Sequence, residues 1–236
     1  MPDTPEFSIC VLTYNRERTL TARWKELACL YAKRPDIELC ILDNGSTDPT
    51  AQTIAAWRIL TMPIAGKESG WCLVTDKVTP NIGFGPGFNR LVSLATGKIV
   101  VLLSDDVRVF GDFLGLVGNI LTAEPRKVIL GQTIVGHPAG WNQFGSQVIP
   151  YLYGHMLAMP RTAWDEIGGF DPLFVPAGYE DVDFSYQASA LGYKLGAVPE
   201  LPIRHESLAA ERYEHTVRMK ALFAVKWGLP NTPARP

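Results

Sequence analysis

The chain has 236 residues, of which 47% are hydrophobic and 19% charged, and its formal net charge is −2. This length and composition are typical of a globular protein that buries one sizeable core. The near-neutral charge argues against a dedicated nucleic-acid-binding surface, which would be strongly basic.

The N-terminus, the apolar runs and the cysteines bear on the cellular compartment of the protein. The first residues, MPDTPEFSICVLTYN, have no basic start followed by a long apolar run, so no signal peptide is predicted. No apolar run reaches the ~18 residues of a membrane span. The cysteines lack the paired spacing of a zinc site, and we expect reduced core thiols in a cytoplasmic protein. They are Cys10, Cys29, Cys40 and Cys72.

The first half of the chain alternates between two patterns. Short apolar runs predict strands, and they span 7–13, 37–43, 71–76 and 98–106. Helical spacing predicts helices between them, over 16–33, 46–60 and 84–96. Strands that alternate with helices predict an α/β fold with a parallel sheet and right-handed crossovers.

After about residue 124 the pattern changes. Strand-like stretches at 127–135 and 146–160 flank a loop, 136–146, that is rich in glycine and aromatic residues. Further elements are a short helix at 161–167, a helix within 178–195, a strand near 194–198 and a last helix at 208–227.

Polar side chains gather where the predicted strands end. In an open parallel sheet these carboxyl ends lie along one edge, where ligands bind. Each polar segment alone could simply form a turn and a helix cap. Four such segments along one edge of the sheet indicate a ligand site. The segments are Thr13 to Arg16, Asp43 to Ser46, Asn81 to Gly87 and Ser104 to Asp106.

Two acidic clusters are candidate reactive groups. Asp105 and Asp106 either point into water and cap the next segment, or bind a divalent cation that holds a diphosphate. His205 is either a structural or exposed side chain or a second ligand, and an imidazole at the site would favour Mn²⁺ over Mg²⁺. In GYEDVDFSYQASALGYKL (178–195), Asp181 lies at the start of a predicted helix. The helix dipole is expected to stabilise the ionised carboxylate by ~0.3–1 kcal/mol. Asp183 is expected to cap the same helix.

Together these stretches resemble the family 2 glycosyltransferases with a GT-A fold. The resemblance covers about residues 7–206 and rests on SICVLTYNR, ILDNGSTD, NIGFGPGFN, LLSDD, GHMLAMPRTAWDEIGGFDPLF, YEDVDFSYQASALGYKL and IRHES. It implies an α/β, GT-A (Rossmann-like) open and mostly parallel sheet flanked by helices, with a smaller mixed acceptor-side subregion. We expect one domain over 1–229, with a nucleotide-binding half (about 7–106), an acceptor and catalytic half (about 107–229), and a flexible tail at 230–236.

The resemblance also implies an activity and a set of site residues. A single sugar would pass from a nucleotide-diphosphate sugar to an acceptor hydroxyl with inversion, assisted by Mn²⁺ or Mg²⁺. Asp181 would be the general base and Glu180 would position the acceptor, while Asp106 and His205 would bind the metal. The nucleotide-binding residues would be Thr13, Tyr14, Arg16, Asp43, Asn81, Gly83 and Asp105.

The acceptor side and the exact activity are less constrained. Trp141, Tyr153 and His155 are candidate contacts to the sugar or acceptor, although aromatic residues that close the core are an equally good interpretation. No QxxRW motif follows the Glu-Asp pair, which favours single transfer over processive polymerisation. UDP- and dTDP-sugars are favoured as donors and GDP-sugars are also compatible. The sequence does not distinguish a glycan, lipid-linked glycan, protein, nucleobase or small molecule as acceptor, and it does not specify the oligomeric state.

Two other functions stay open. A nucleotidyltransferase would need a glycine-rich phosphate loop after the first strand, and TYNRERT has no glycine. A non-catalytic nucleotide-sugar-binding relative is the other, and the presence of Asp106, Asp181 and His205 together argues against it.

Overall fold

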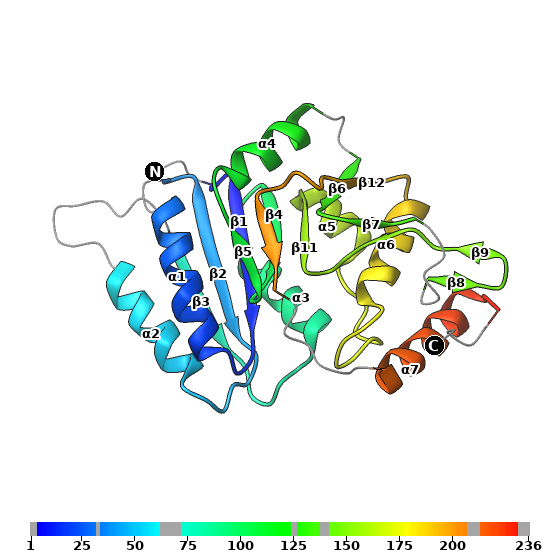
Figure 1. Ribbon diagram of the computed structural model, residues 1–236, viewed down its shortest axis with the longest axis horizontal. Helices are drawn as coiled ribbons and strands as arrows, with labels where there is room; N and C mark the ends of the chain where they lie inside the picture. Colours follow the sequence, from blue (N-terminus) through cyan, green and yellow to red (C-terminus); the bar gives the residue numbers. More distant parts are fainter. Residues whose placement is uncertain are drawn as a thin grey trace.

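The protein is built around a central sheet. The computed structural model describes residues 4–31, 34–61, 72–123, 127–136, 142–206 and 213–230. These residues form a 7-stranded sheet in the order β12-β6-β11-β4-β1-β2-β3 (Figure 1). The strands are β1 (Phe7–Thr13), β2 (Ile37–Asp43), β3 (Cys72–Lys77), β4 (Ile99–Ser104), β6 (Val128–Gly131), β11 (Met156–Pro160) and β12 (Lys194–Ala197).

The strand directions confirm the predicted α/β class with a mostly parallel sheet. β11 runs antiparallel to its neighbours β4 and β6, and the other neighbouring pairs in this sheet are parallel. β1 lies between β2 and β4, so the chain continues to one side of β1 and then crosses to the other. Such a reversal leaves a crevice outside the carboxyl ends of the two central strands, here β1 and β4.

Helices cover both faces of the sheet. On one face α1 (Glu17–Tyr31), α2 (Thr50–Thr61) and α4 (Phe113–Ala123) bury Leu20, Trp57 and Phe113 against the sheet. On the other, α3 (Phe84–Leu94), α5 (Arg161–Ile167) and α6 (Glu180–Ala190) bury Phe88, Trp164 and Phe184. Helices, sheet and helices thus form three layers, and the crevice at the carboxyl ends of β1 and β4 lies at one end of them (Figure 1).

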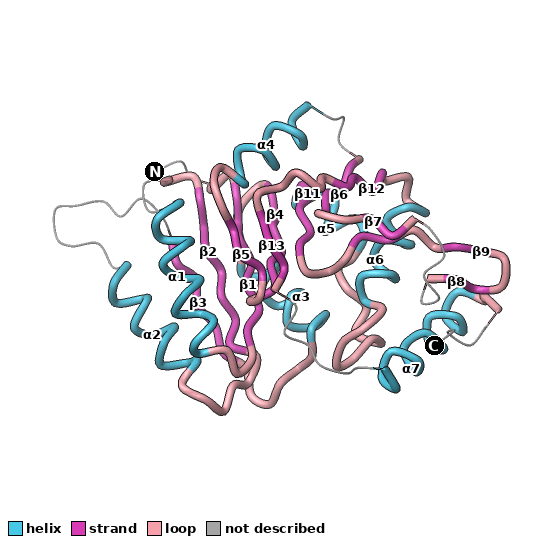
Figure 2. Tube along the Cα trace, in the orientation of Figure 1, coloured by secondary structure: helices cyan, strands magenta, loops and turns pink. Residues whose placement is uncertain are grey.

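Three short ribbons and a last helix complete the described fold. The ribbons pair β5 (Val107–Val109) with β13 (Ile203–His205), β7 (Ile134–Val135) with β10 (Tyr151–Leu152), and β8 (Gln143–Phe144) with β9 (Gln147–Val148). Figure 2 shows α7 (Tyr213–Trp227) at the far end of the molecule, beyond α6. A third apolar cluster joins α7 to the segment before α6 through Phe144, Tyr179 and Phe223.

Several boundaries differ from the sequence-based expectation for identifiable reasons. α2 begins at Thr50 rather than near 46, because Asp48 accepts the Thr50 N–H at 3.0 Å and the Glu17 N–H at 3.3 Å. α4 was not predicted, since FLGLVGNILTA contains two glycines and has no polar face to give it helical periodicity. β5 and β13 were not predicted either, because three residues are too few to show a pattern.

Two further expectations can be compared with the described residues. Cys10 and Cys40 are buried free thiols that lie opposite each other on β1 and β2, whereas the side chains of Cys29 and Cys72 lie outside the described part. None of the helices within the described ranges is both long and apolar enough to cross a membrane.

Candidate functional site

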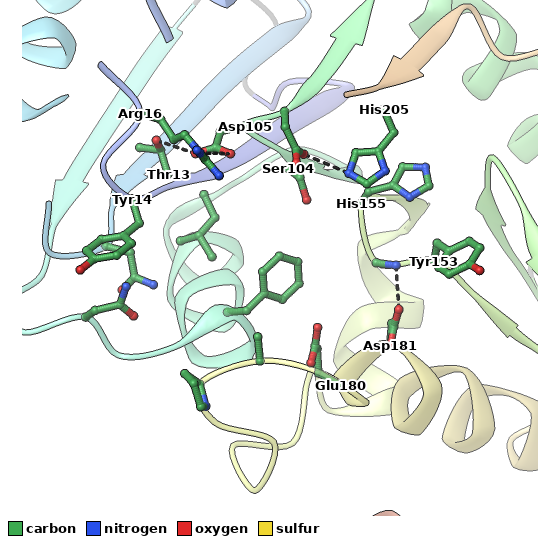
Figure 3. A pocket seen from close by; sticks show the side chains of 18 residues that line it. Thr13, Tyr14, Arg16, Ser104, Asp105, Tyr153, His155, Glu180, Asp181 and His205 are labelled. Atoms are coloured by element: carbon green, nitrogen blue, oxygen red, sulfur yellow. Dashed lines mark hydrogen bonds and ion pairs between the residues drawn. The ribbon is translucent and has the colours of Figure 1, made fainter. Parts of the chain in front are cut away.

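A cavity of about 580 Å³ opens at the carboxyl ends of β1 and β4 (Figure 3). Its walls bring together residues from both halves of the chain. The sequence-predicted residues that line it are Thr13, Tyr14, Arg16, Asn81, Asp105, Asp106, Tyr153, His155, Glu180, Asp181 and His205. Asp43 and Gly83 lie behind the wall rather than in it, and Trp141 lies outside the described residues.

Asp105 is fastened to the end of β1. The Thr13 hydroxyl donates to Asp105 Oδ2 at 2.9 Å, and Arg16 Nε lies 3.8 Å from Oδ1. Burial raises the pKa of Asp105 to about 6, although the Thr13 hydrogen bond and the Arg16 charge oppose the rise. The β1 and β4 ends therefore form one polar surface.

Asn44 joins the other two strand ends, and the sequence analysis placed it in a polar segment but singled out its neighbour Asp43 instead. Its side-chain Nδ2 donates to the Gly83 carbonyl at 3.0 Å, and its Oδ1 accepts the Ile82 N–H at 3.0 Å. Asn44 lines the cavity, whereas Asp43 accepts the Ser46 N–H at 2.8 Å behind it. The only available signal was DNGS, which predicts a turn equally well.

Gly45 makes this junction possible. Its φ of +88° favours glycine, and a Cβ there would lie 2.6 Å from the Asn81 backbone nitrogen. The β2 end and the loop before α3 therefore approach at backbone distance, which places Asn81 at the cavity wall.

Asp106 and His205 face each other across the β4–β5 turn. His205 Nε2 lies 3.2 Å from Asp106 Oδ1, because β13 pairs with β5 in the register His205 to Val107. Among the described residues no cluster of three or more His, Cys, Asp or Glu side chains is arranged to hold a metal. One carboxylate and one imidazole still fit a divalent cation whose other ligands are phosphate oxygens and water.

An aromatic stack backs His205. The His155 and His205 rings lie 4.4 Å apart at 7°, and the Tyr153 ring follows at 6.0 Å from His155. Gln132 Oε1 lies 3.2 Å from His155 Nε2. Burial and the neighbouring His205 lower the pKa of His155 to about 4, so it is neutral at pH 7. Tyr153 is 41% exposed at the cavity edge.

Asp181 stands on the opposite wall (Figure 3), at the first turn of α6. The Gly154 N–H donates to Oδ2 at 3.0 Å, and the Val182 N–H donates to Oδ1 at 2.9 Å. The sequence-based expectation was that the helix start would keep this carboxyl readily ionised. Burial instead raises the pKa of Asp181 to about 6, because desolvation outweighs the backbone donors.

Asp183 does not cap α6, contrary to the prediction. It is fully buried and accepts hydrogen bonds from α7: from Lys226 Nζ at 2.7 and 2.8 Å and from Trp227 Nε1 at 2.8 Å. Lys226 also donates to Asp171 at 2.7 Å. The third acid of the cluster thus holds α7 against the helix that carries Asp181.

Comparison with known families and proteins gives consistent results. The model of Glycosyl transferase family 2 matches residues 8–175, a span that ends before Asp181 and His205. The abequosyltransferase RfbV of Salmonella typhimurium is 28% identical over 117 residues, which are 50% of this chain and 33% of that protein. The chain therefore spans about a third of this curated relative.

Solved structures share the fold at low identity. The mannosyltransferase PcManGT from Pyrobaculum calidifontis, solved with GDP-Man and Mn²⁺, superposes with a TM-score of 0.71 at 20% identity, over 95% of this chain and 65% of that one. Staphylococcus aureus TarS 1–349, solved with UDP-GlcNAc, gives 0.63 at 19% identity, over 92% and 66%. These likenesses confirm the predicted GT-A fold class, and the family match confirms the resemblance noted in the sequence.

Proposed function

We propose that this chain, which belongs to glycosyl transferase family 2, transfers one sugar from a nucleotide-diphosphate sugar to an acceptor hydroxyl with inversion. The observation that best supports this is the arrangement of one cavity. Asp106 and His205 line it at the strand ends, and Asp181 lines it from α6. Inversion requires a base and a departing diphosphate on opposite faces of the sugar, and the placement of these residues on facing walls supports that requirement.

The nucleotide lies, in this proposal, along the ends of β1, β2 and β4. Tyr14 is 45% exposed there and offers an aromatic face to the base. Asp105, held by Thr13, accepts hydrogen bonds from the ribose, and Arg16 and Asn81 complete the wall. Asp43 and Gly83 contribute from behind, by shaping the turn and the loop that Asn44 joins. UDP- or dTDP-sugars are the favoured donors.

Asp106 and His205 are the residues that would hold a divalent cation, Mn²⁺ or Mg²⁺. Such a cation would supply positive charge to offset the charge that builds on the departing diphosphate. The 3.2 Å separation of His205 Nε2 and Asp106 Oδ1 supports this pairing, since two atoms that bind one cation must lie close together. His155, neutral and stacked on His205, keeps that imidazole in its orientation.

Asp181 is the proposed general base. The acceptor oxygen forms a bond to the anomeric carbon while the bond from that carbon to the diphosphate oxygen breaks, and the electron pair leaves with the diphosphate. The acceptor proton passes to Asp181, whose oxygens each retain a lone pair beyond the backbone N–H bonds. A pKa of about 6 makes this carboxylate more basic than a solvated aspartate, yet ionised at pH 7.

Glu180 and Tyr153 are the proposed acceptor contacts. Glu180 is the neighbour of Asp181 and lines the same wall, where it accepts a hydrogen bond from an acceptor hydroxyl. Tyr153 presents its ring at the cavity edge and stacks against the acceptor or the transferred sugar. His155 acts behind Tyr153, through the ring stack.

Hydrolysis of the sugar donor tests the proposal even when the acceptor is unknown, because a water molecule takes the place of the acceptor hydroxyl as the nucleophile. UDP-, dTDP- and GDP-sugars would be incubated with the protein and Mn²⁺, and proton NMR would follow the released sugar. We expect one donor to be cleaved, with an α-linked sugar released first as the β-anomer. Release of the α-anomer would contradict inversion, and failure of every nucleotide sugar to bind in calorimetry would contradict the proposed function itself.

A further inference from the structure

The ribbon that carries His205 is too short to be stable alone. β5 and β13 pair over three residues each, and isolated two-stranded ribbons are marginal in water even when longer. The Glu206 N–H donates to the Asp106 carbonyl at 2.9 Å and extends the pairing by one step. Val107, Val109 and Ile203 anchor the ribbon in the core, but His205 lies beyond them on its exposed end. The position of His205 opposite Asp106 therefore depends also on what holds that end.

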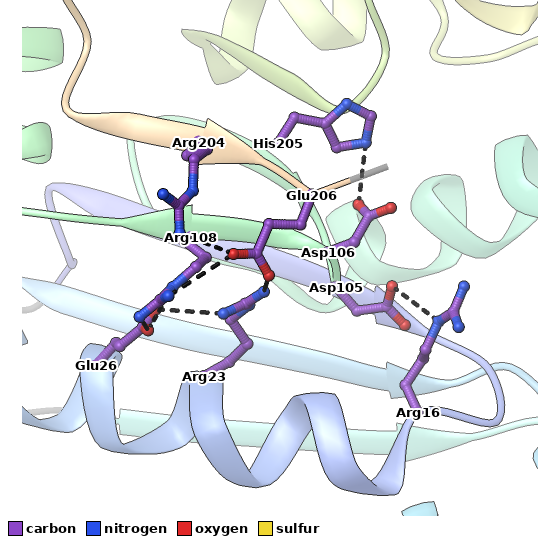
Figure 4. Close-up of polar contacts among 9 residues, drawn as sticks. All are labelled: Arg16, Arg23, Glu26, Asp105, Asp106, Arg108, Arg204, His205 and Glu206. Atoms are coloured by element: carbon purple, nitrogen blue, oxygen red, sulfur yellow. Dashed lines mark hydrogen bonds and ion pairs between the residues drawn. The ribbon is translucent and has the colours of Figure 1, made fainter. Parts of the chain in front are cut away.

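Glu206, the residue after His205, anchors that end. Arg23 Nη2 donates to its Oε2 at 2.9 Å, and Arg204 Nη2 donates to its Oε1 at 3.0 Å. Arg108 Nη1 lies 3.7 Å from the same Oε1. Figure 4 shows the three arginine side chains gathered around Glu206, with the Asp106–His205 contact beside them.

Arg23 is the strongest of these supports. Its side chain is 9% exposed and is carried by α1, whereas the Arg204 side chain is 61% exposed on the ribbon itself. Glu26, also on α1, pairs with Arg108 and lies 3.6 Å from Arg23 Nη1. The Glu206 side chain is 36% exposed, so the pair is half-buried, and it joins two separate elements, whereas Arg204 pairs within its own ribbon.

The arginines do not themselves line the cavity. Neither Arg23, Arg108 nor Arg204 contributes to its wall, and their guanidinium groups are directed to Glu206 and Glu26. Any effect of these residues on a ligand must therefore pass through residues that do line the cavity, and Glu206 connects Arg23 directly to the neighbouring His205. This distinguishes them from arginines that bind phosphate directly.

We propose that Glu206 is a positioning residue whose carboxylate, held by Arg23, fixes His205 opposite Asp106 and so sets the affinity of the diphosphate end of the site for a divalent cation. This rests on the proposed function. Residues behind a metal ligand commonly change metal affinity by about 10- to 100-fold when they are replaced. We expect an effect of that size from a residue that touches neither the nucleotide nor the cation.

The test measures the gain in nucleotide affinity that Mn²⁺ provides. Calorimetry would give the Kd of UDP, with dTDP and GDP in parallel, in Mn²⁺ and in chelator. Glu206→Gln keeps the shape and removes the charge, and we expect it to reduce the Mn²⁺ gain by about 10-fold while the Kd in chelator stays unchanged. Asp36→Asn is the matched control. It removes the charge and one acceptor oxygen from a carboxylate that accepts hydrogen bonds from Arg34 at 2.8 and 2.6 Å, just before β2 and far from the site.

The outcomes separate this proposal from the proposed function. A Glu206→Gln protein that melts earlier but keeps the wild-type Mn²⁺ gain would overturn the positioning role. If that variant does not fold, Arg23→Gln is measured by the same criterion. The variant with both Glu206→Gln and Arg23→Gln tests whether the two residues act as a pair. A Mn²⁺ gain equal to that of Glu206→Gln alone supports action through the pair, and additive losses of the Mn²⁺ gain overturn it. A wild-type protein that binds none of the nucleotides, or gains nothing from Mn²⁺, contradicts the proposed function instead.

Discussion

Lys226 of α7 donates to both carboxylate oxygens of Asp183 of α6, at 2.7 and 2.8 Å. Asp183 lies two residues after Asp181 and is fully buried. The same ammonium reaches Asp171, so one lysine joins both ends of the segment that leads to the proposed base. This segment contributes Pro176 and Ala177 to the cavity wall. The pair therefore connects the stability of the C-terminal helix to the shape of the site.

Replacing Lys226 with methionine is expected to destabilise the fold by about 3 kcal/mol, because it leaves a buried carboxylate without its cation. Urea unfolding measures this change. Lys98→Met, which breaks the exposed pair with Glu6, is the control and is expected to cost less than about 1 kcal/mol. Equal losses in the two variants would contradict a structural role for the Asp183–Lys226 pair.

The rate of donor hydrolysis is expected to depend on pH through Asp181. Its pKa is raised to about 6, so the carboxylate accepts a proton above that value and is already protonated below it. At saturating donor the rate should fall about tenfold per pH unit below 6 and level off above it. Asp105 has a similar pKa but acts on donor binding, which saturation removes. A flat rate across this range would contradict the base assignment.

The same raised pKa has a consequence for stability. A carboxyl that is harder to ionise in the folded state than in the unfolded state stabilises the fold while protonated, and that stability is lost as pH rises through about 6. Asp181→Asn cannot ionise, so its stability relative to wild type should increase between pH 4 and pH 7.5, by about 1–3 kcal/mol. Urea unfolding at both pH values checks this. A difference between the two proteins that does not change with pH would mean that Asp181 is not desolvated.

Removal of divalent metal is expected to weaken nucleotide binding and stop hydrolysis. Asp106→Asn and His205→Ala should each reproduce the effect of chelator on the Kd of UDP, by about 10-fold or more, because each removes a proposed ligand. Asp76→Asn, which breaks the ion pair with Arg90 on the surface, is a suitable control. Undiminished hydrolysis in chelator would contradict the metal assignment.

Much of the site was predictable because its residues follow strands. Thr13 ends β1, Asp105 and Asp106 directly follow β4, and the parallel sheet alone brings these positions together. Asp181 and His205 were predicted from the motifs that carry the family resemblance. The cavity lining includes all five.

What the sequence could not indicate depends on contacts between distant segments. Arg23 and Glu206 are separated by 183 positions, and Arg23 looked like one more residue of an amphipathic helix. Asp183 was interpreted as a cap because it lies at the start of a helix. Its actual partners, Lys226 and Trp227, lie on another helix, so the local sequence could not reveal them. The raised pKa of Asp181 follows from desolvation, which local sequence does not determine.

The most direct test of the central claim is the activity of Asp181→Asn at pH 7.5 with Mn²⁺ and the best donor. Calorimetry would measure donor affinity and NMR would measure hydrolysis on the same preparation. We expect the donor Kd to stay within about twofold of wild type while the rate falls by at least about 100-fold, because only proton transfer is removed. Turnover close to wild type, with the donor bound normally, would contradict Asp181 as the general base.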